Sequence, residues 1–230
     1  MHLLPRRIFK SLRARLLHLL RGDPNKFLRG VRGVIHVGAN AGQERDLYRR
    51  YGLHVLWIEP IPHVFDTLAA NIRDYDNQSA IQALVTDVDD QLYEFHLASN
   101  GGQSSSILEL QEHRDVWPDV VYTETLQLRS TTLPTLLKTH SVDVTHYDTL
   151  ILDTQGSELL VLRGAEPILH CFRFIKVEVP DFEAYRGCCQ VSDIEDLLRP
   201  RGFTEIKRTK FAEHPEAGSY FDIVYEAKGP

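Results

Sequence analysis

The chain has 230 residues, 43% of them hydrophobic and 25% charged, which is typical of a globular protein with one sizeable core. Its 14 glycines and 11 prolines are too few for a collagen, its hydrophobicity is too high for a disordered chain, and no apolar run reaches the roughly 18 residues of a membrane span. Its three cysteines form neither an even disulfide framework nor a zinc-type pair, which favours a reducing, cytoplasmic location.

Residues 1–30 are predicted to be a basic helical extension ahead of one domain at residues 31–230. Residues 1–33 carry nine Lys or Arg and one Asp, although the net charge of the whole chain is −6. Between the arginines of residues 6–21, apolar residues recur at three- and four-residue spacing, which predicts an amphipathic helix. Such a helix either packs on the domain or lies on the inner, anionic membrane surface. His18 interrupts the leucine run, which argues against a secretory signal.

Strand and helix patterns alternate from residue 31 to residue 226. The first five elements read strand, helix, strand, helix, strand, which predicts a parallel sheet covered by helices on both faces. The predicted strands are residues 34–37, 54–58, 80–86, 92–97, 123–130, 149–153, 172–179, 203–208 and 220–225. The predicted helices are residues 42–51, 62–73, 133–138, 157–162 and 192–198.

The first predicted strand ends in the turn Gly38-Ala39-Asn40-Ala41-Gly42, which leads into a helix. Glycines let the backbone of such a turn approach a ligand closely. Glu59 follows the second strand, where a carboxylate accepts hydrogen bonds from ribose hydroxyls. The pair predicts a ligand that contains adenosine. A dinucleotide site needs a glycine where this chain has Asn40, so S-adenosylmethionine fits better than NAD, and an NAD-binding oxidoreductase is the alternative.

Three blocks of the sequence stand out, namely residues 34–43 (VIHVGANAGQ), residues 57–60 (WIEP) and residues 150–165 (LILDTQGSELLVLRGA). Together they resemble the FkbM family of S-adenosylmethionine-dependent methyltransferases. The resemblance implies a class I methyltransferase fold, an α/β Rossmann-like fold whose mostly parallel seven-stranded sheet has an antiparallel last strand and helices on both faces. It also implies O-methylation of a hydroxyl on a sugar, polysaccharide or natural product.

The same resemblance implies which residues bind the methyl donor. Gly38, Asn40 and Gly42 line its amino-acid part, Glu59 holds its ribose, and Asp87 meets its adenine edge. Family members usually carry Asp at the position of His36, so this imidazole either bonds to the donor or is a core histidine with both nitrogens satisfied. The expected cofactor-binding residues are therefore His36, Gly38, Asn40, Gly42, Glu59, Pro60 and Asp87.

Methyl transfer to a hydroxyl requires that the oxygen is aligned and its proton removed. Asp153 ends a predicted strand at the ligand-binding edge of the sheet, so it is the first candidate for the base, with helix capping as the alternative. Gln155 and Glu158 follow as further candidates, and the charge of Glu158 would also suit the start of a helix. Glu178, in the next strand, either faces the same cleft or is paired structurally.

The predicted partner is a small-molecule or glycan acceptor that carries a hydroxyl group. Nucleic acid is not expected because the chain beyond residue 33 is acidic and no RNA-binding motif is present. No metal site is predicted, since the dispersed histidines lack ligand spacing. A flexible, hydroxyl-rich loop at residues 100–106 would suit closure over substrate. A third hypothesis is a non-catalytic, membrane-associated binding module.

Overall fold

The computed structural model describes residues 25–228, so the predicted basic helix at residues 6–21 lies outside the described residues. The chain divides into a short unit that ends at Val31 and a second unit that begins at Arg32. In the first unit the structure describes one 3₁₀ helix, η1 (Lys26–Leu28). Within residues 25–228, no helix has the length and hydrophobicity needed to cross a membrane.

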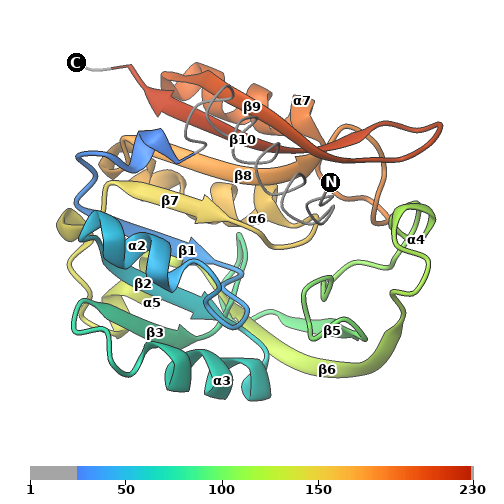
Figure 1. Cartoon of the computed structure of the whole chain (residues 1–230), viewed down its shortest axis with the longest axis horizontal. Coiled ribbons are helices and arrows are strands. Elements are labelled where there is room, and N and C mark those ends of the chain that lie inside the picture. Colours follow the sequence, from blue (N-terminus) through green and yellow to red (C-terminus); the bar gives the residue numbers. More distant parts are fainter. Residues whose placement is uncertain (1–24, 229–230) are drawn as a thin grey trace, which may run out of the picture. The chain divides into compact units, whose positions relative to one another are not determined.

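The second unit is built on a seven-stranded sheet. Its strands are β1 (Gly33–Val37), β2 (His54–Glu59), β3 (Gln78–Gln82), β7 (Thr149–Leu152), β8 (Phe174–Pro180), β9 (Phe203–Glu213) and β10 (Ser219–Ala227). Their order across the sheet is β3-β2-β1-β7-β8-β10-β9 (Figure 1). Pairing from β3 to β8 is parallel, and β10 runs antiparallel to both of its neighbours. The predicted fold, with its antiparallel last strand, is confirmed.

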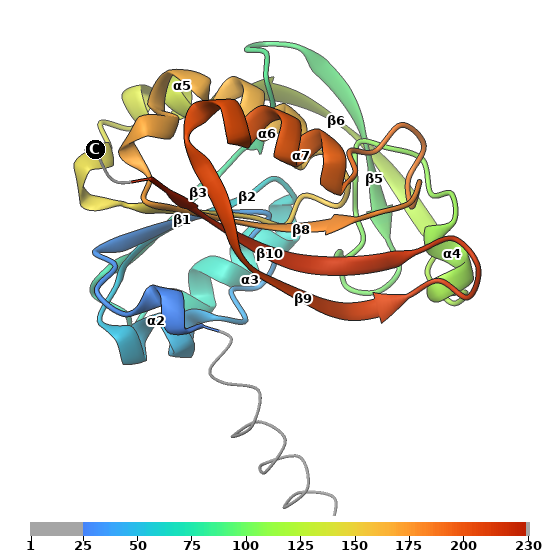
Figure 2. The ribbon, with the colours of Figure 1, turned by 90° about the horizontal axis from the view of Figure 1, so that it is seen from above.

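Helices cover both faces of this sheet (Figure 2). One face carries α2 (Arg45–Tyr51) and α3 (Pro62–Ile72), and the other carries α5 (Leu133–Thr139), α6 (Glu158–Gly164) and α7 (Val191–Leu198). Three 3₁₀ helices complete the connections, namely η2 (Val144–His146), η3 (Glu166–Cys171) and η4 (Arg199–Arg201). Because both faces are covered, every residue of β1 and of β7 is buried, and these strands have continuous apolar sequences apart from His36 and Thr149.

The predicted third strand at residues 80–86 is wrong in its extent. It is split into β3, which ends at Gln82 in the main sheet, and β4 (Leu84–Val85), which pairs in parallel with β6 (Tyr122–Thr131). Strand β6 pairs antiparallel with β5 (Leu92–Ala98), so a second, three-stranded sheet forms. Pairing partners so far apart in the chain leave no trace in local hydrophobic periodicity.

The three-stranded sheet and the short helix α4 (His113–Val116) lie beyond the carboxyl ends of β1 and β7 (Figure 1). This is the edge at which open α/β sheets bind their ligands. The part of the chain with the fewest recognisable motifs therefore forms one wall of the candidate site.

Candidate active site

A cavity of about 410 Å³ opens at the carboxyl ends of β1, β2 and β7, and its size is within the range of small-molecule sites. The loops after these strands meet there with residues 83–85, Phe95, residues 100–105 and α4. Seven of the predicted site residues line the cavity, namely His36, Gly38, Asn40, Glu59, Pro60, Asp153 and Gln155.

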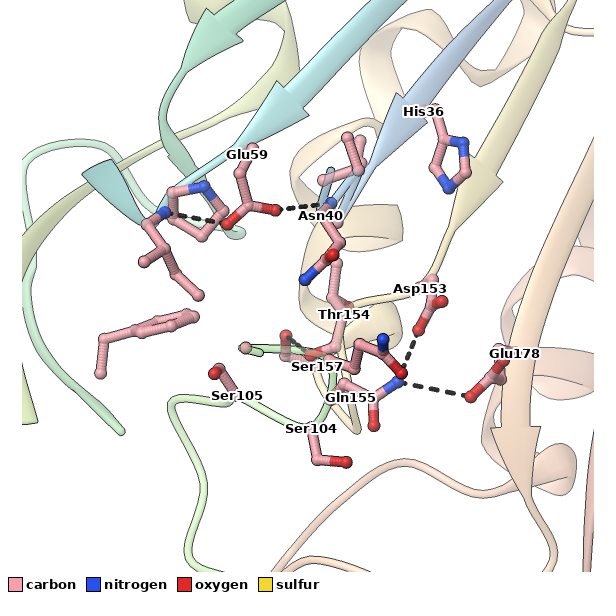
Figure 3. Close-up of a pocket in the computed structure, with 18 of the residues that line it drawn as sticks. His36, Asn40, Glu59, Ser104, Ser105, Asp153, Thr154, Gln155, Ser157 and Glu178 are labelled. Atoms are coloured by element: carbon pink, nitrogen blue, oxygen red, sulfur yellow. Dashed lines mark hydrogen bonds between the residues drawn. The ribbon is translucent and has the colours of Figure 1, made fainter. Parts of the chain in front are cut away.

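Glu59 ties two cavity loops together (Figure 3). Its Oε2 accepts a hydrogen bond of 2.8 Å from the backbone N–H of Asn40, and its Oε1 accepts one of 2.9 Å from the backbone N–H of Ile61. The residue is only 3% exposed, and burial raises the pKa of its carboxyl to about 7. Each carboxylate oxygen has two lone pairs, so both can also accept a hydrogen bond from a ligand hydroxyl in the cavity.

Asn40 connects the first loop to the loop at residues 100–106. Its φ of 44° lies in the left-handed region, which Asn tolerates better than most side chains. Its Nδ2 donates to the carbonyl of Gly101 at 3.1 Å, and its Oδ1 accepts from the backbone N–H of Ala41 at 2.8 Å. The side chain that replaces the dinucleotide-type glycine therefore stabilises the loop itself.

Gly38 permits two loops to approach each other closely. Its φ is 82°, and a Cβ at this position would overlap the backbone carbonyl oxygen of Asp153. The turn after β1 is therefore in direct contact with the end of β7, where the candidate base lies.

Two predicted donor contacts lie outside the cavity. Gly42 does not line it, and a Cβ there would come within 2.7 Å of Leu68 Cδ1, so Gly42 faces α3. Asp87 does not line it either, and its Cα packs against Gly164 at the end of α6. The split of the third strand is the physical reason, since it places Leu84 and Val85 at the cavity wall in place of Asp87.

His36 is a buried histidine that also borders the cavity. Its ring stacks on Trp57 with the ring centroids 5.1 Å apart, and its Nδ1 is 3.1 Å from the hydroxyl of Tyr48. Burial, assisted by the positive charge of Lys176, lowers the pKa of His36 to about 3, so the imidazole is neutral at pH 7.

Gln155 bridges two carboxylates at the cavity (Figure 3). Its Nε2 donates to Asp153 Oδ1 at 2.6 Å and to Glu178 Oε1 at 3.3 Å, while its Oε1 accepts from the Tyr185 hydroxyl at 2.7 Å. Burial raises the pKa of Asp153 to about 7. Burial and the nearby carboxylate of Asp153 raise the pKa of Glu178 well above its ordinary value. Both carboxyl groups line the cavity. Because the pKa of Asp153 is about 7, this residue can exchange a proton with a ligand near neutral pH.

Glu158 is not placed to act on a substrate, contrary to the prediction. It is fully buried, lies outside the cavity lining, and accepts hydrogen bonds from the backbone N–H groups of Thr154 at 2.7 Å and Gly156 at 3.1 Å. The thiol of Cys189 donates to it at 3.4 Å. Its carboxylate turns back onto the loop that precedes α6, where it accepts hydrogen bonds from backbone N–H groups of that loop.

The serines of residues 104–106 are buried and bonded to the protein. The hydroxyl of Ser106 donates to the carbonyl of Gln155 at 2.8 Å, and Ser105 Oγ accepts from the N–H of Ala98 at 2.9 Å. Ser104 Oγ is 3.0 Å from His113 Nε2, and His113 Nδ1 is 2.7 Å from the hydroxyl of Tyr220. The sequence analysis missed the roles of His113 and Tyr220, because 107 residues separate them and no local pattern joins them.

The sheet order, with its antiparallel last strand and helices on both faces, is that of a class I, Rossmann-like architecture. The sequence profile of the Methyltransferase FkbM domain matches residues 36–205, and the chain belongs to the FkbM methyltransferase family. Membership of this family confirms S-adenosylmethionine as the methyl donor. No curated protein matches the chain significantly.

Solved structures show the same fold at low sequence identity. The methyltransferase domain of METTL16 superposes with a TM-score of 0.51 at 14% identity, over 99% of this chain and 71% of that one. Aeropyrum pernix fibrillarin, in complex with natively bound S-adenosyl-L-methionine, gives a TM-score of 0.46 at 14% identity, over 93% of this chain and 74% of that one. A human methyltransferase 10 domain containing protein gives 0.46 at 13% identity, over 99% and 85%. At these identities the METTL16 likeness establishes the fold alone.

Proposed function

We propose that this protein transfers a methyl group from S-adenosylmethionine to a hydroxyl group of a small molecule or glycan. The observation that carries the proposal is the contact between the turn after β1 and the end of β7. Gly38, in the loop that would hold the donor, abuts the backbone of Asp153, and the carboxylate of Asp153 borders the same cavity. A donor and a proton acceptor can therefore lie next to each other.

The residues present fit the donor. Glu59 is fixed by two backbone N–H groups and retains acceptor capacity for ribose hydroxyls. Leu84, Val85 and Phe95 give the neighbouring wall an apolar surface suited to a planar base. The loop at Gly38 and Asn40 presents its backbone to the amino-acid part of the donor.

When bound, S-adenosylmethionine supplies an electrophilic methyl group on a positively charged sulfur. The work of the chain is to align the acceptor oxygen and to take its proton. Transfer would form a bond between the acceptor oxygen and the methyl carbon and would break the carbon–sulfur bond, whose electron pair would stay on the sulfur of S-adenosylhomocysteine, while Asp153 would take the hydroxyl proton. Gln155 keeps Oδ1 of Asp153 engaged, which leaves Oδ2 to face the acceptor.

Glu178 and Tyr185 complete the support of Asp153. The hydroxyl of Tyr185 holds the side-chain carbonyl of Gln155, so the amide must present its N–H groups to the carboxylates. Burial and the nearby carboxylate of Asp153 raise the pKa of Glu178 well above its ordinary value, so Glu178 can keep its proton while Asp153 is ionised.

The experiment that tests this function is transfer of label from methyl-labelled S-adenosylmethionine to a panel of alcohols, phenols and glycosides, with mass spectrometry to locate the new methyl group. We expect an O-methyl product and saturable binding of S-adenosylhomocysteine in calorimetry, with no binding of NAD. A methyl group found on nitrogen would overturn the hydroxyl assignment. Binding of NAD without binding of S-adenosylhomocysteine would favour the oxidoreductase alternative.

A further inference from the structure

Near Gln155, one end of the cavity is lined by residues that the proposed donor contacts do not use, because His113 packs on Tyr185, whose hydroxyl binds Gln155. This end is lined by His113 and Trp117, by Phe211 of β9, and by residues 103–105. It is built from parts of the chain that carry no family motif, and it is the place where an acceptor would reach Asp153.

Two aromatic side chains form the wall of this end, and they share one support. The ring of Trp117 packs against His113 with centroids 4.5 Å apart and against Tyr220 at 5.0 Å. The ring of Phe211 packs against the same Tyr220 at 5.8 Å. Tyr220 is 3% exposed, whereas Phe211 is 45% exposed and Trp117 is half-buried. The buried ring of Tyr220 thus supports two partly exposed aromatic rings at the cavity.

The titratable side chains that line the cavity are acidic or neutral. The lining includes the carboxyl groups of Glu44, Glu59, Asp153 and Glu178, and burial raises the pKa of each. Its two histidines are neutral at pH 7, because burial lowers the pKa of His36 to about 3 and that of His113 to about 4. None of the lining residues, all of which fall within residues 25–228, is Lys or Arg. The nearby Lys176 forms an ion pair of 2.7 Å with Asp222 and does not line the cavity.

A phosphate or carboxylate on the acceptor would find no cationic partner here and would face carboxylates instead. A neutral ring finds apolar aromatic surface on one side. Gln103 also lines the cavity, and its side-chain amide makes no hydrogen bond to the described residues, so it is available to ring hydroxyls.

We propose that Trp117 and Phe211 form the acceptor subsite, and that the acceptor is a neutral ring without phosphate groups that stacks on these two side chains. This inference rests on the proposed methyl transfer to a hydroxyl and adds the class of substrate. It separates this protein from enzymes that act on nucleic acids, because a polyanion does not suit the acidic cavity.

The experiment compares matched acceptors that differ only in charge. Methyl-labelled S-adenosylmethionine is offered with phenyl and methyl glycosides, with the 6-phosphates of the same glycosides, and with single-stranded RNA. We expect kcat/KM for at least one neutral glycoside to exceed that for its phosphate by at least about tenfold, with no label on RNA. Faster transfer to a phosphorylated partner or to RNA overturns the proposal, as does failure of every neutral ring as an acceptor.

Variants then test the wall itself. Trp117→Ala and Phe211→Ala are each expected to lower kcat/KM for the neutral acceptor by about tenfold, mainly through KM, while affinity for S-adenosylhomocysteine stays within about twofold. Trp117→Phe should recover part of the loss. Ile206→Ala is the matched control, because Ile206 is an exposed apolar residue of the same strand as Phe211 and does not line the cavity. Unchanged KM in both alanine variants would overturn the proposed acceptor subsite. If the unmodified protein does not bind S-adenosylhomocysteine at all, the proposed function itself is overturned.

Discussion

The side-chain amide of Gln155 donates to Oδ1 of Asp153 over 2.6 Å, and the same nitrogen reaches the carboxylate of Glu178. Gln155 has a φ of 54°, a left-handed backbone conformation that costs a residue other than glycine about 1 kcal/mol or more. The loop is held there by Glu158, which accepts hydrogen bonds from the backbone on both sides of Gln155. The buried carboxylate beneath the loop thus positions the amide that orients the proposed base.

Replacing Asp153 by Asn is expected to lower kcat for methyl transfer by about 10²–10⁴-fold, the usual contribution of a general base. Affinity for S-adenosylhomocysteine should change by less than about threefold. Radiolabel transfer and calorimetry measure the two quantities on the same preparation. Asp87→Asn is the matched control, since Asp87 lies outside the cavity. Normal turnover in Asp153→Asn would remove Asp153 from the mechanism.

Transfer by the unmodified protein is expected to depend on pH through the raised pKa of Asp153, which is about 7. The base acts when deprotonated, so log kcat/KM should rise with a slope of about one below pH 7 and level off above it. A stopped assay from pH 5.5 to 8.5 measures the profile. A rate that is flat across this range, or that falls as pH rises through 7, would contradict the role of Asp153.

The free protein is expected to become less stable as pH rises from about 4.5 to 7.5. Glu59 and Asp153 both have folded-state pKa values of about 7, above those of an unfolded chain, so the folded state binds more protons in this window. Each group should contribute about 1–3 kcal/mol to the decrease, since one pKa unit corresponds to about 1.4 kcal/mol. Urea unfolding at several pH values measures this trend. The trend should be smaller in Asp153→Asn, and an equal slope in that variant would contradict the assignment.

Replacing Glu59 by Ala is expected to weaken binding of S-adenosylhomocysteine by at least about tenfold. The change removes a charged acceptor for the ribose and also frees the N–H groups of Asn40 and Ile61, and each such hydrogen bond is worth about 1–3 kcal/mol. Calorimetry measures the dissociation constant. Asp87→Ala should bind as the unmodified protein does, and the reverse result for the two variants would restore Asp87 as a donor contact.

Replacing Glu158 by Ala is expected to lower the free energy of unfolding by about 2–4 kcal/mol, because buried N–H groups lose their acceptor. Urea denaturation gives this value, and residual transfer is measured at a temperature where the variant is folded. Since the charge of Glu158 helps to raise the pKa of Asp153, the pH at half-maximal kcat/KM should fall in Glu158→Gln. Full stability combined with loss of activity would instead indicate direct participation of Glu158.

Most of the architecture could be read from the sequence, because parallel strands buried on both faces are short apolar runs between amphipathic helices. Strands such as β1 and β2 were predicted to within a residue or so of their observed ends. The positions of Gly38, Asn40 and Glu59 at the cavity follow for the same reason, since residues at the carboxyl ends of adjacent parallel strands meet at one edge.

Tertiary structure alone decided the rest of the site. Local periodicity could not show that β4 leaves the main sheet, which removed Asp87 from the cavity, or that Glu158 turns back onto its own loop. The aromatic wall depends on Tyr220, which lies more than a hundred residues from His113 and is brought to it by the antiparallel pairing of β10. Such contacts between distant segments arise from packing and pairing, which a single sequence does not encode as a local pattern.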